Sequence, residues 1–390
     1  MPIYEYRGLN AAGERASGFV DADSPKAARL ALSAQGVVAD TLATPSFRGV
    51  ATPPWRTRFY EGLGALLQGG FPMSQALKFL ADDASGPRRG ALLAISGAIS
   101  SGATLADAIR SAAGTLPPFE AAALSTAEVT GSQGPMLSRL SSFMEADRRV
   151  RDNIRSALAY PAAVLCLALL LLATVAFAIL PRAAALFPAN AVPASVRILR
   201  AAAPVVLVAF CAAIAAAWRL VASLSHPAPG PGAARRDRLL LSLPIARRLL
   251  PCLWSSRFAA TMSLLLDAGL SPQDSILPAG EATGSPLVAS LAQSASASVR
   301  QGAPLSQAVA SIAPLAKSLS AWFAVGEKTG SLAAMLSSAA DRARNDYERA
   351  LKRVLSLLEP LLVAVVGLAV LAVALAVLRP MLDLTTGAAL

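Results

Sequence analysis

The sequence predicts an all-α membrane protein: two duplicated cytoplasmic helical-bundle modules with three transmembrane helices, preceded by a small α+β N-terminal domain. Three observations predict this fold class. The composition is 55% hydrophobic and only 15% charged, with a mean hydropathy of +0.53. Three long apolar runs interrupt the chain, and a polar segment recurs at a shift of 199 residues. So much apolar surface cannot all be buried in soluble cores when charged residues are so scarce.

Residues 1–45 are expected to form a small ββα-type domain. The segments IYEYRGL and ERASGFV flank Ala-Ala-Gly, a pattern typical of a β-hairpin. A helix should follow, with Ser24 as its N-cap, Pro25 at its first position and Gly36 at its end. Residues 46–56 are rich in proline and are expected to be a linker. The N-terminus lacks the pattern of a secretory signal, so this domain should stay on the side of synthesis.

The internal repeat begins with FYEGLGALLQGGFPMSQAL (59–77), which aligns with FAATMSLLLDAGLSPQDSI (258–276). Each segment places an apolar stripe on one face of a helix. The two stripes consist of Phe59, Leu63, Leu66 and Leu67, and of Phe258, Met262, Leu265 and Leu266. Both helices are followed by a glycine, Gly70 or Gly269, which suits the left-handed backbone conformation just past a helix end.

The repeat continues through SGATLADAI and QGAPLSQAV, then through AEVTGSQGPML and GEKTGSLAAML. Each copy ends in a charged segment that leads into a proline, in Tyr160-Pro161 and Glu359-Pro360. Glycine, proline and serine punctuate apolar-periodic segments, so both copies are expected to be all-helical. The expected boundaries are 57–157 for the first cytoplasmic module, 221–256 for a Pro/Gly-rich linker and 257–356 for the second module.

Three apolar runs are interpreted as transmembrane helices, at 158–180, 201–220 and 357–379. Each approaches the roughly 20 helical residues that cross the hydrocarbon core. A buried helix of a soluble domain remains the alternative, above all for the second run, which is the shortest and is rich in alanine. No run carries an ionisable residue in its middle, which argues against a transporter or pump.

The distribution of Lys and Arg predicts the orientation. Thirteen of them flank the runs on the side of the two modules, against four on the other side: Arg182, Arg197 and Arg200 in the loop 181–200, and Arg379 just before the tail 380–390. Since positive charge accumulates on the cytoplasmic side, the N-terminus and both modules should be cytoplasmic. The loop 181–200 and the tail should be periplasmic.

Several functional classes are disfavoured. The net charge is +11, but aromatic residues make up only 5%, too few to stack nucleic-acid bases, so no nucleic acid is expected as a partner. The chain has one histidine, His226, and three cysteines without metal-ligand spacing. We therefore expect no enzyme activity, no catalytic residues and no cofactor. GEKTGS is not a phosphate loop, because Glu327 precedes its lysine and the first copy has Val129 in place of that lysine.

The two turns AEVTGS and GEKTGS are first interpreted as structural. In each, a glycine (Gly131 or Gly330) should break a helix, and the next serine should cap the following helix. The alternative is that Glu128 and Glu327 contact a partner or a divalent cation. The basic clusters beside the spans are first interpreted as membrane-flanking charge, with docking of a cytoplasmic partner as the alternative. The docking candidates are Arg148, Arg149, Arg151, Glu128, Glu327, Lys328, Arg342 and Arg344.

The layout resembles a known family, general secretion pathway protein F. The opening YEYRGLNAAGERASGFVDADSPKAARLALSAQG is similar to its N-terminal domain. The segments LLQGGFPMSQAL and LLLDAGLSPQDSI, together with the AEVTGS and GEKTGS turns, resemble its two repeated domains. The resemblance covers nearly the full chain, and the order of the parts is specific.

The resemblance implies a multi-pass platform protein of the bacterial inner membrane in a type II secretion system. Such a protein couples a cytoplasmic secretion ATPase to assembly of pseudopilus subunits and protein export. The type IV pilus platform proteins share this plan and are the alternative, and a membrane transporter or membrane-bound enzyme is the less favoured one. The implied partners are membrane lipid, the ATPase, other inner-membrane platform proteins, pseudopilins or pilins, and further copies of the chain.

Overall fold

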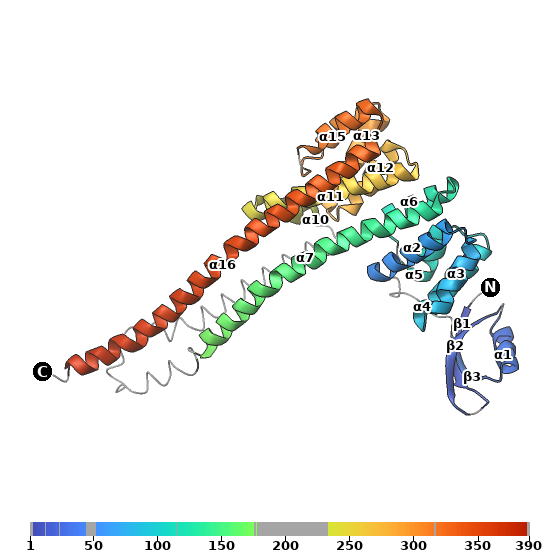
Figure 1. Cartoon of the computed structure of the whole chain (residues 1–390), viewed down its shortest axis with the longest axis horizontal. Coiled ribbons are helices and arrows are strands. Elements are labelled where there is room, and N and C mark those ends of the chain that lie inside the picture. The colour runs from blue at the N-terminus through green and yellow to red at the C-terminus, as the bar shows by residue number, and fades with distance from the viewer. Residues whose placement is uncertain are drawn as a thin grey trace. The chain divides into compact units, whose positions relative to one another are not determined.

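A computed structural model describes residues 3–11, 13–22, 24–43, 52–114, 116–174, 177, 233–315 and 317–387 (Figure 1). The chain divides into two compact units. The first comprises Met1–Arg148 and Ala234–Asn345, and therefore contains the N-terminal domain and most of both copies of the repeat. The second comprises Arg149–Ala233 and Asp346–Leu390.

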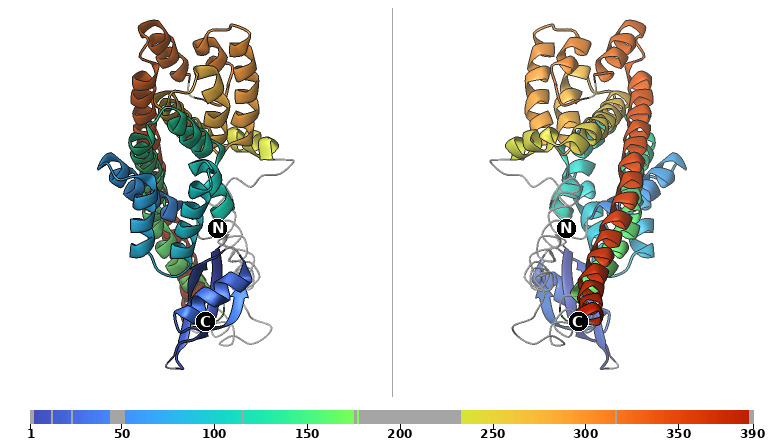
Figure 2. Two further views of the ribbon diagram at one scale, coloured as in Figure 1. Left: turned by 90° about the vertical axis from the view of Figure 1, so that its right-hand side faces the viewer. Right: turned by 90° about the vertical axis from the view of Figure 1, so that its left-hand side faces the viewer.

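The N-terminal domain is a three-stranded antiparallel sheet with one helix on its face (Figure 2). Its elements are β1 Ile3–Leu9, β2 Arg15–Asp21, α1 Pro25–Ala34 and β3 Val38–Ala43, and the strand order is β2-β1-β3. The buried core of the domain consists of Tyr4, Val20, Ala22, Ala28 and Leu32. The hairpin is as predicted, but β3 adds a strand to the predicted ββα arrangement. This strand pairs with the free edge of β1, a long-range contact that local patterning does not reveal.

Local signals placed α1 correctly. The side chain of Ser24 accepts a hydrogen bond from the backbone N–H of Ala27 at 3.2 Å, and Pro25 is the first helical residue. Gly36, just past the helix, has a φ of +73°. These three features satisfy the helix ends as the sequence predicted.

Each copy of the repeat is a bundle of helices. The first copy contains α2 Pro53–Gln68, α3 Met73–Asp83, α4 Pro87–Ser100, α5 Leu105–Ala113, α6 Pro118–Val129 and α7 Gln133–Thr174. The second contains α11 Pro244–Ala268, α12 Pro272–Ala282, α13 Pro286–Arg300, α14 Leu305–Ala310, α15 Leu319–Thr329 and α16 Leu332–Gly387, and α10 Ala233–Ser242 precedes it. Many of these helices begin at proline, which suits the first helical position because the missing N–H has no helical partner there.

Two predicted linkers are shorter than expected. Helix α2 begins at Pro53, so the end of the expected linker 46–56 is helical. Helices α10 and α11 occupy most of 233–256, and the rest of the expected linker, 221–232, lies outside the described residues. Pro53, one of the prolines that suggested the first linker, instead opens α2, and Pro244 opens α11 within the second.

The apolar stripes form the cores of the modules, as the sequence predicted. Phe59 and Leu63 are buried in the first copy, and Phe258, Met262 and Leu265 are buried in the second. The ring centroids of Phe258 and Phe323 lie 6.3 Å apart, so the stripe of α11 faces α15. The glycines that follow α2 and α11 have positive φ values of +85° at Gly70 and +100° at Gly269, as predicted.

The two copies pack against each other inside the first unit, through what we call the internal interface. It joins α6 and α7 of the first copy to α11 and α12 of the second. Leu264, Leu265 and Ala268 of α11 belong to the same buried cluster as the core of the first copy. Two ion pairs flank this cluster: Arg257 Nε lies 3.0 Å from Asp147 Oδ1, and Arg139 Nη1 lies 2.7 Å from Asp267 Oδ2.

Two long helices lead into predicted membrane spans. Helix α7 extends to Thr174, inside the run 158–180, and α16 covers the run 357–379 and continues to Gly387. The run 201–220 and the loop 181–200 lie outside the described residues. Among those that are described, one helix, Ala246–Ala268, is long and apolar enough to cross a membrane. This helix is not one of the three predicted spans; it is 67% buried within the protein and forms part of the module core. The three transmembrane helices at 158–180, 201–220 and 357–379 therefore stay a prediction.

We expect Leu265→Ala to lower the free energy of unfolding by about 2 to 5 kcal/mol, because it leaves a cavity in a core that both copies share. The matched control is Leu66→Ala at the equivalent position of the first copy, where the side chain is only half-buried. Thermal unfolding of the detergent-solubilised chain, followed by tryptophan fluorescence, compares the two variants. Equal shifts would contradict the shared core.

Candidate functional site

Three of the candidate residues, Glu128, Glu327 and Lys328, lie at two equivalent turns. Helix α6 ends at Val129 and α15 ends at Thr329. Gly131 and Gly330 follow with nearly identical positive φ values of +67° and +66°, which confirms that these glycines break the helices. In each turn two hydroxyl groups are hydrogen-bonded at 2.7 Å, Thr130 with Ser132 and Thr329 with Ser331.

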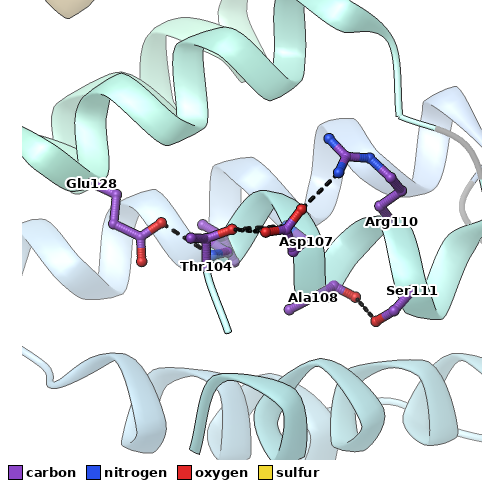
Figure 3. Close-up of polar contacts among 7 residues, drawn as sticks. Thr104, Asp107, Ala108, Arg110, Ser111 and Glu128 are labelled. Carbon is purple, nitrogen blue, oxygen red and sulfur yellow. Dashed lines mark hydrogen bonds and ion pairs between the residues drawn. The ribbon is translucent and has the colours of Figure 1, made fainter. Parts of the chain in front are cut away.

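The glutamates of these turns bind the beginnings of other helices. A carboxylate oxygen of Glu128 accepts a hydrogen bond from the backbone N–H of Leu105, the first residue of α5, at 3.2 Å (Figure 3). Glu327 accepts one from Leu305, the first residue of α14, also at 3.2 Å. A carboxylate there satisfies an unpaired N–H and interacts favourably with the helix dipole. Sequence reasoning placed both glutamates in helix-capping turns but could not identify the helices that they cap.

The start of α5 carries a further polar network that the second copy lacks. The hydroxyl of Thr104 accepts from the N–H of Asp107 at 3.1 Å and donates to its carboxylate at 2.9 Å (Figure 3). Arg110 donates to the same carboxylate at 2.6 Å. In the second copy Pro304 precedes α14 and provides no side-chain cap. The contact from glutamate to the helix start is therefore the feature that both copies share.

Divalent-cation binding at these turns stays a prediction. Within the ranges that the structure describes, no group of three or more His, Cys, Asp and Glu side chains is arranged to hold a metal ion. The carboxylates of Glu128 and Glu327 each bind a backbone N–H. A cation would have to share an oxygen with that hydrogen bond or use the second oxygen.

The basic candidates lie along α7, α15 and α16. Arg148 and Arg149 are exposed and Arg151 is half-buried on α7. Lys328 is exposed at the end of α15, next to Glu327. On α16, Arg342 is exposed, whereas Arg344 is half-buried and lies 3.8 Å from Asp341. Lys328 and Arg342 thus offer positive charge to solvent in the second copy.

Sequence reasoning missed a buried polar group between α2 and α6. The hydroxyl of Tyr60 donates to Glu120 at 2.8 Å, and Arg56 Nη2 donates to the same carboxylate at 3.2 Å. Arg56 Nε lies 3.1 Å from the carboxylate as an ion pair. Glu120 is only 1% exposed. At the equivalent positions the second copy has Ser255, Ala259 and Leu319, so this group belongs to the first copy alone.

Burial controls the ionisation of this group. Desolvation raises the pKa of Glu120 above its ordinary value of 4.5, and the charge and hydrogen bonds of Arg56 and Tyr60 oppose that rise. Burial also raises the pKa of Tyr60 well above its ordinary value, and the neighbouring Glu120 carboxylate adds to the effect. Tyr60 therefore stays a neutral hydrogen-bond donor near pH 7.

The geometry defines a class of protein before any comparison. Two copies of one helical module share a core, each continues into a long helix, and their polar turns serve to fix helix starts. Exposed charge lies at the module ends, and the described residues hold no metal-binding cluster. These are the properties of a duplicated helical scaffold.

Comparison with known proteins agrees with this class. Residues 59–181 and 258–380 each match the family described as "Type II secretion system (T2SS), protein F". Residues 1–41 match its N-terminal domain. Because these matches cover well over half of the chain, this protein belongs to the type II secretion system protein F family.

Several relatives are similar over nearly their full length. Type II secretion system protein F of Vibrio cholerae is 25% identical over 98% of both chains. The type 4 fimbrial assembly protein PilC of Pseudomonas putida is 28% identical, again over 98% of both. The type IV pilus assembly protein PilC of Thermus thermophilus is 25% identical over 95% of both.

We expect Glu128→Ala to lower the free energy of unfolding by about 1 kcal/mol, because it removes the acceptor at the first N–H of α5. Glu128→Gln should lose less, since the amide oxygen can still accept. Thermal unfolding is the measurement, and Glu61→Ala, at an exposed glutamate of α2, is the control. A rise in melting temperature with millimolar Mg²⁺ or Ca²⁺, absent from Glu128→Ala, would support the predicted cation instead.

We expect Arg56→Met to cost about 3 to 5 kcal/mol, because it leaves the Glu120 carboxylate buried without its cation. Arg56→Met with Glu120→Leu, which introduces the residue found at the equivalent position 319, should recover much of that loss. Thermal unfolding of the two variants measures both effects. A double variant as unstable as the single one would show that the ion pair is not the cause.

The same variant has a pH signature. Burial raises the pKa of Glu120 in the folded chain above its ordinary value of 4.5. The raised pKa therefore stabilises the folded chain below pH 4.5, and this stabilisation is lost as the pH rises through the pKa of Glu120 in the folded chain. Removing Arg56 raises that pKa further. The destabilisation by Arg56→Met should therefore be larger at pH 7 than at pH 4.5, and a pH-independent loss would contradict this explanation.

Proposed function

We propose that this chain is the inner-membrane platform of a type II secretion system, which couples a cytoplasmic secretion ATPase to pseudopilus assembly and protein export. One observation carries the proposal: a duplicated helical module, with the sequence of the protein F family, continues directly into long apolar helices. The platform role is one of contact and transmission, without catalysis by the chain itself.

The long helices provide a physical basis for transmission. Helix α7 has 42 residues and α16 has 56. At about 1.5 Å of rise per residue, α16 spans roughly 84 Å, far more than the thickness of a bilayer. An unbroken helix is stiff along its axis because its backbone hydrogen bonds run in that direction. A displacement of a module by the ATPase would therefore pass along a continuous helix toward the membrane. Each helix has a proline where its apolar run begins, Pro161 in α7 and Pro360 in α16, and a helix can bend at such a position.

The topology belongs to the proposal. Three crossings, at 158–180, 201–220 and 357–379, place both modules in the cytoplasm and the C-terminus in the periplasm. The excess of Lys and Arg on the side of the modules supports this orientation. Within the membrane, spans without ionisable residues in their middle would pack laterally against other apolar helices, such as those of pseudopilins.

The ATPase would dock on the charged ends of the modules. In the second copy the exposed positive charge of Lys328 and Arg342 lies on α15 and α16, close in sequence to the turn that separates them. Arg344 lies two residues beyond Arg342 on the same helix. In the first copy the docking candidates are Arg148, Arg149, Arg151 and Glu128, of which only Glu128 has its equivalent, Glu327, among the candidates of the second copy. Charged groups at the rim of an interface mainly accelerate and orient association.

A type IV pilus platform is the second candidate, because relatives named as PilC match the chain as extensively as those named as protein F. Both candidates assign the same mechanical role to the modules. They differ in the subunits that are assembled, pseudopilins or pilins, and in whether secreted protein leaves the cell.

Binding of the purified full-length chain to the ATPase of its own system tests the proposal. We expect Lys328→Glu with Arg342→Glu to weaken binding at least tenfold, which corresponds to about 1.4 kcal/mol. Arg88→Glu with Arg89→Glu, on exposed positions of α4, is the matched control and should bind as the wild type does. ATP hydrolysis by the chain alone, or no binding by the wild type, would overturn the platform role.

A further inference from the structure

The internal interface joins two surfaces that are not equivalent in the repeat. The first copy contributes α6 and α7, and the second contributes α11 and α12. At the shift of 199 residues, α11 and α12 correspond to α2 and α3, and α6 and α7 correspond to α15 and α16. Each chain therefore carries a second pair of matching surfaces that takes no part in the internal interface. We call them the α2–α3 face and the α15–α16 face.

The α2–α3 face is exposed where its counterpart in α11 and α12 is buried. Leu264 and Ala268 of α11 are 6% and 2% exposed, whereas the equivalent Ala65 and Gly69 are exposed. Leu270 packs against the core of the first copy. Its equivalent, Phe71, is 47% exposed. The α2–α3 face thus retains an apolar side chain at the position that is covered in the internal interface.

The glycine turns of the two faces have the same backbone shape but different surroundings. A β-carbon at Gly269 would lie 3.5 Å from the methyl group of Thr130, because α6 ends against this turn. The equivalent Gly70 has a similar positive φ, and a β-carbon there would meet nothing within 4 Å. The turn of the first copy therefore leaves open the space that Thr130 fills in the second.

The α15–α16 face offers the complementary side chains. Thr126 and Thr130 line the turn at Gly269 in the internal interface. Their equivalents are Val325, which is 48% exposed, and Thr329, which is exposed. A second pair of contacts would therefore bring the methyl groups of Val325 and Thr329 to the turn at Gly70.

One ion pair of the internal interface is retained in the second pair of faces. Asp147 and Arg257, which are paired at 3.0 Å, correspond to Asp346 and Arg58. Arg58 is exposed, and Asp346 is half-buried and accepts a hydrogen bond from Arg349 of its own helix. The other pair is not retained, because its equivalents are Ser338 and Gln68. Both hydrogen-bond within their own copies, Gln68 to Gly134 and Ser138 and Ser338 to Ala334.

From this correspondence we infer that two copies of this chain associate head to tail, with the α2–α3 face of one on the α15–α16 face of the other. Phe71 packs beside Val325 of the neighbouring copy, and Arg58 pairs with Asp346 there. This contact between two chains uses the helices that are equivalent to those of the internal interface within one chain. Because its two sides differ, it either closes into a ring or continues into a longer array. The inference rests on the repeat geometry and is independent of the proposed function.

Charge reversal across this contact gives a test that distinguishes a head-to-tail association from other kinds. The full-length chain is purified in detergent, and its mass is measured by light scattering over a range of concentrations. Arg58→Asp places two aspartates opposite each other in every contact, and Asp346→Arg places two arginines opposite each other. Each variant alone should associate at least tenfold more weakly than the wild type.

Mixing the two variants should restore association. In a mixed pair, the aspartate introduced at position 58 of one chain faces the arginine introduced at position 346 of the other. The second possible contact between the same two chains joins the native Arg58 and Asp346. Arg88→Asp, at an exposed arginine of α4 outside the face, is the control and should associate as the wild type does. Thermal unfolding of each variant checks that the modules remain folded.

A monomeric wild type would overturn the inference, and so would single variants that keep the wild-type mass. Failure of the mixture to associate, with both variants folded, would also overturn it, because it would show that positions 58 and 346 do not face each other. A binding defect toward the ATPase with unchanged self-association would bear on the proposed function alone.

Discussion

Burial of the apolar face of α11 is the interaction on which the first unit depends. Leu265 lies in the stripe that forms the core of its own copy, yet with Leu264 and Ala268 it also belongs to the buried cluster of the first copy. Each fully buried leucine contributes about 1.5 to 3 kcal/mol. One helix thereby joins the two copies through a common core, and the ion pairs at its edges fix the orientation of the two copies rather than provide most of the stability.

Both copies of the repeat have the same arrangement of helices, but they differ in the polar side chains that are buried between those helices. The glutamate that caps the start of a neighbouring helix is present in both, at Glu128 and Glu327, because each bundle must satisfy the same exposed N–H groups. The buried Arg56–Glu120 pair occurs only in the first copy, where the second has serine and leucine. Buried ion pairs often stabilise no more than apolar residues of similar size, so the second copy can keep its fold without one.

The proposed platform role depends on two features of the architecture, the long helices and the surfaces that the internal interface leaves exposed. Helices α7 and α16 each extend from a module into an apolar run, so the proposed transmission would pass through them. An interface between non-equivalent surfaces within the chain leaves the complementary surfaces for contacts between chains. One kind of helix–helix contact can therefore join the two copies within a chain and, in the inferred association, join separate chains.

The sequence by itself determined the features that depend on neighbours along the chain. These include the hairpin, the cap at Ser24, the apolar stripes, the glycine turns and the duplication, because helix periodicity and capping act within a few residues. Only the tertiary structure decided the pairing of β3 with β1, the helix that Glu128 caps and the contact of Arg56 with Glu120, which are 64 residues apart. The internal interface belongs to this second group as well. Each of these contacts joins distant segments, and local patterning carries no information about which distant partner a residue will meet.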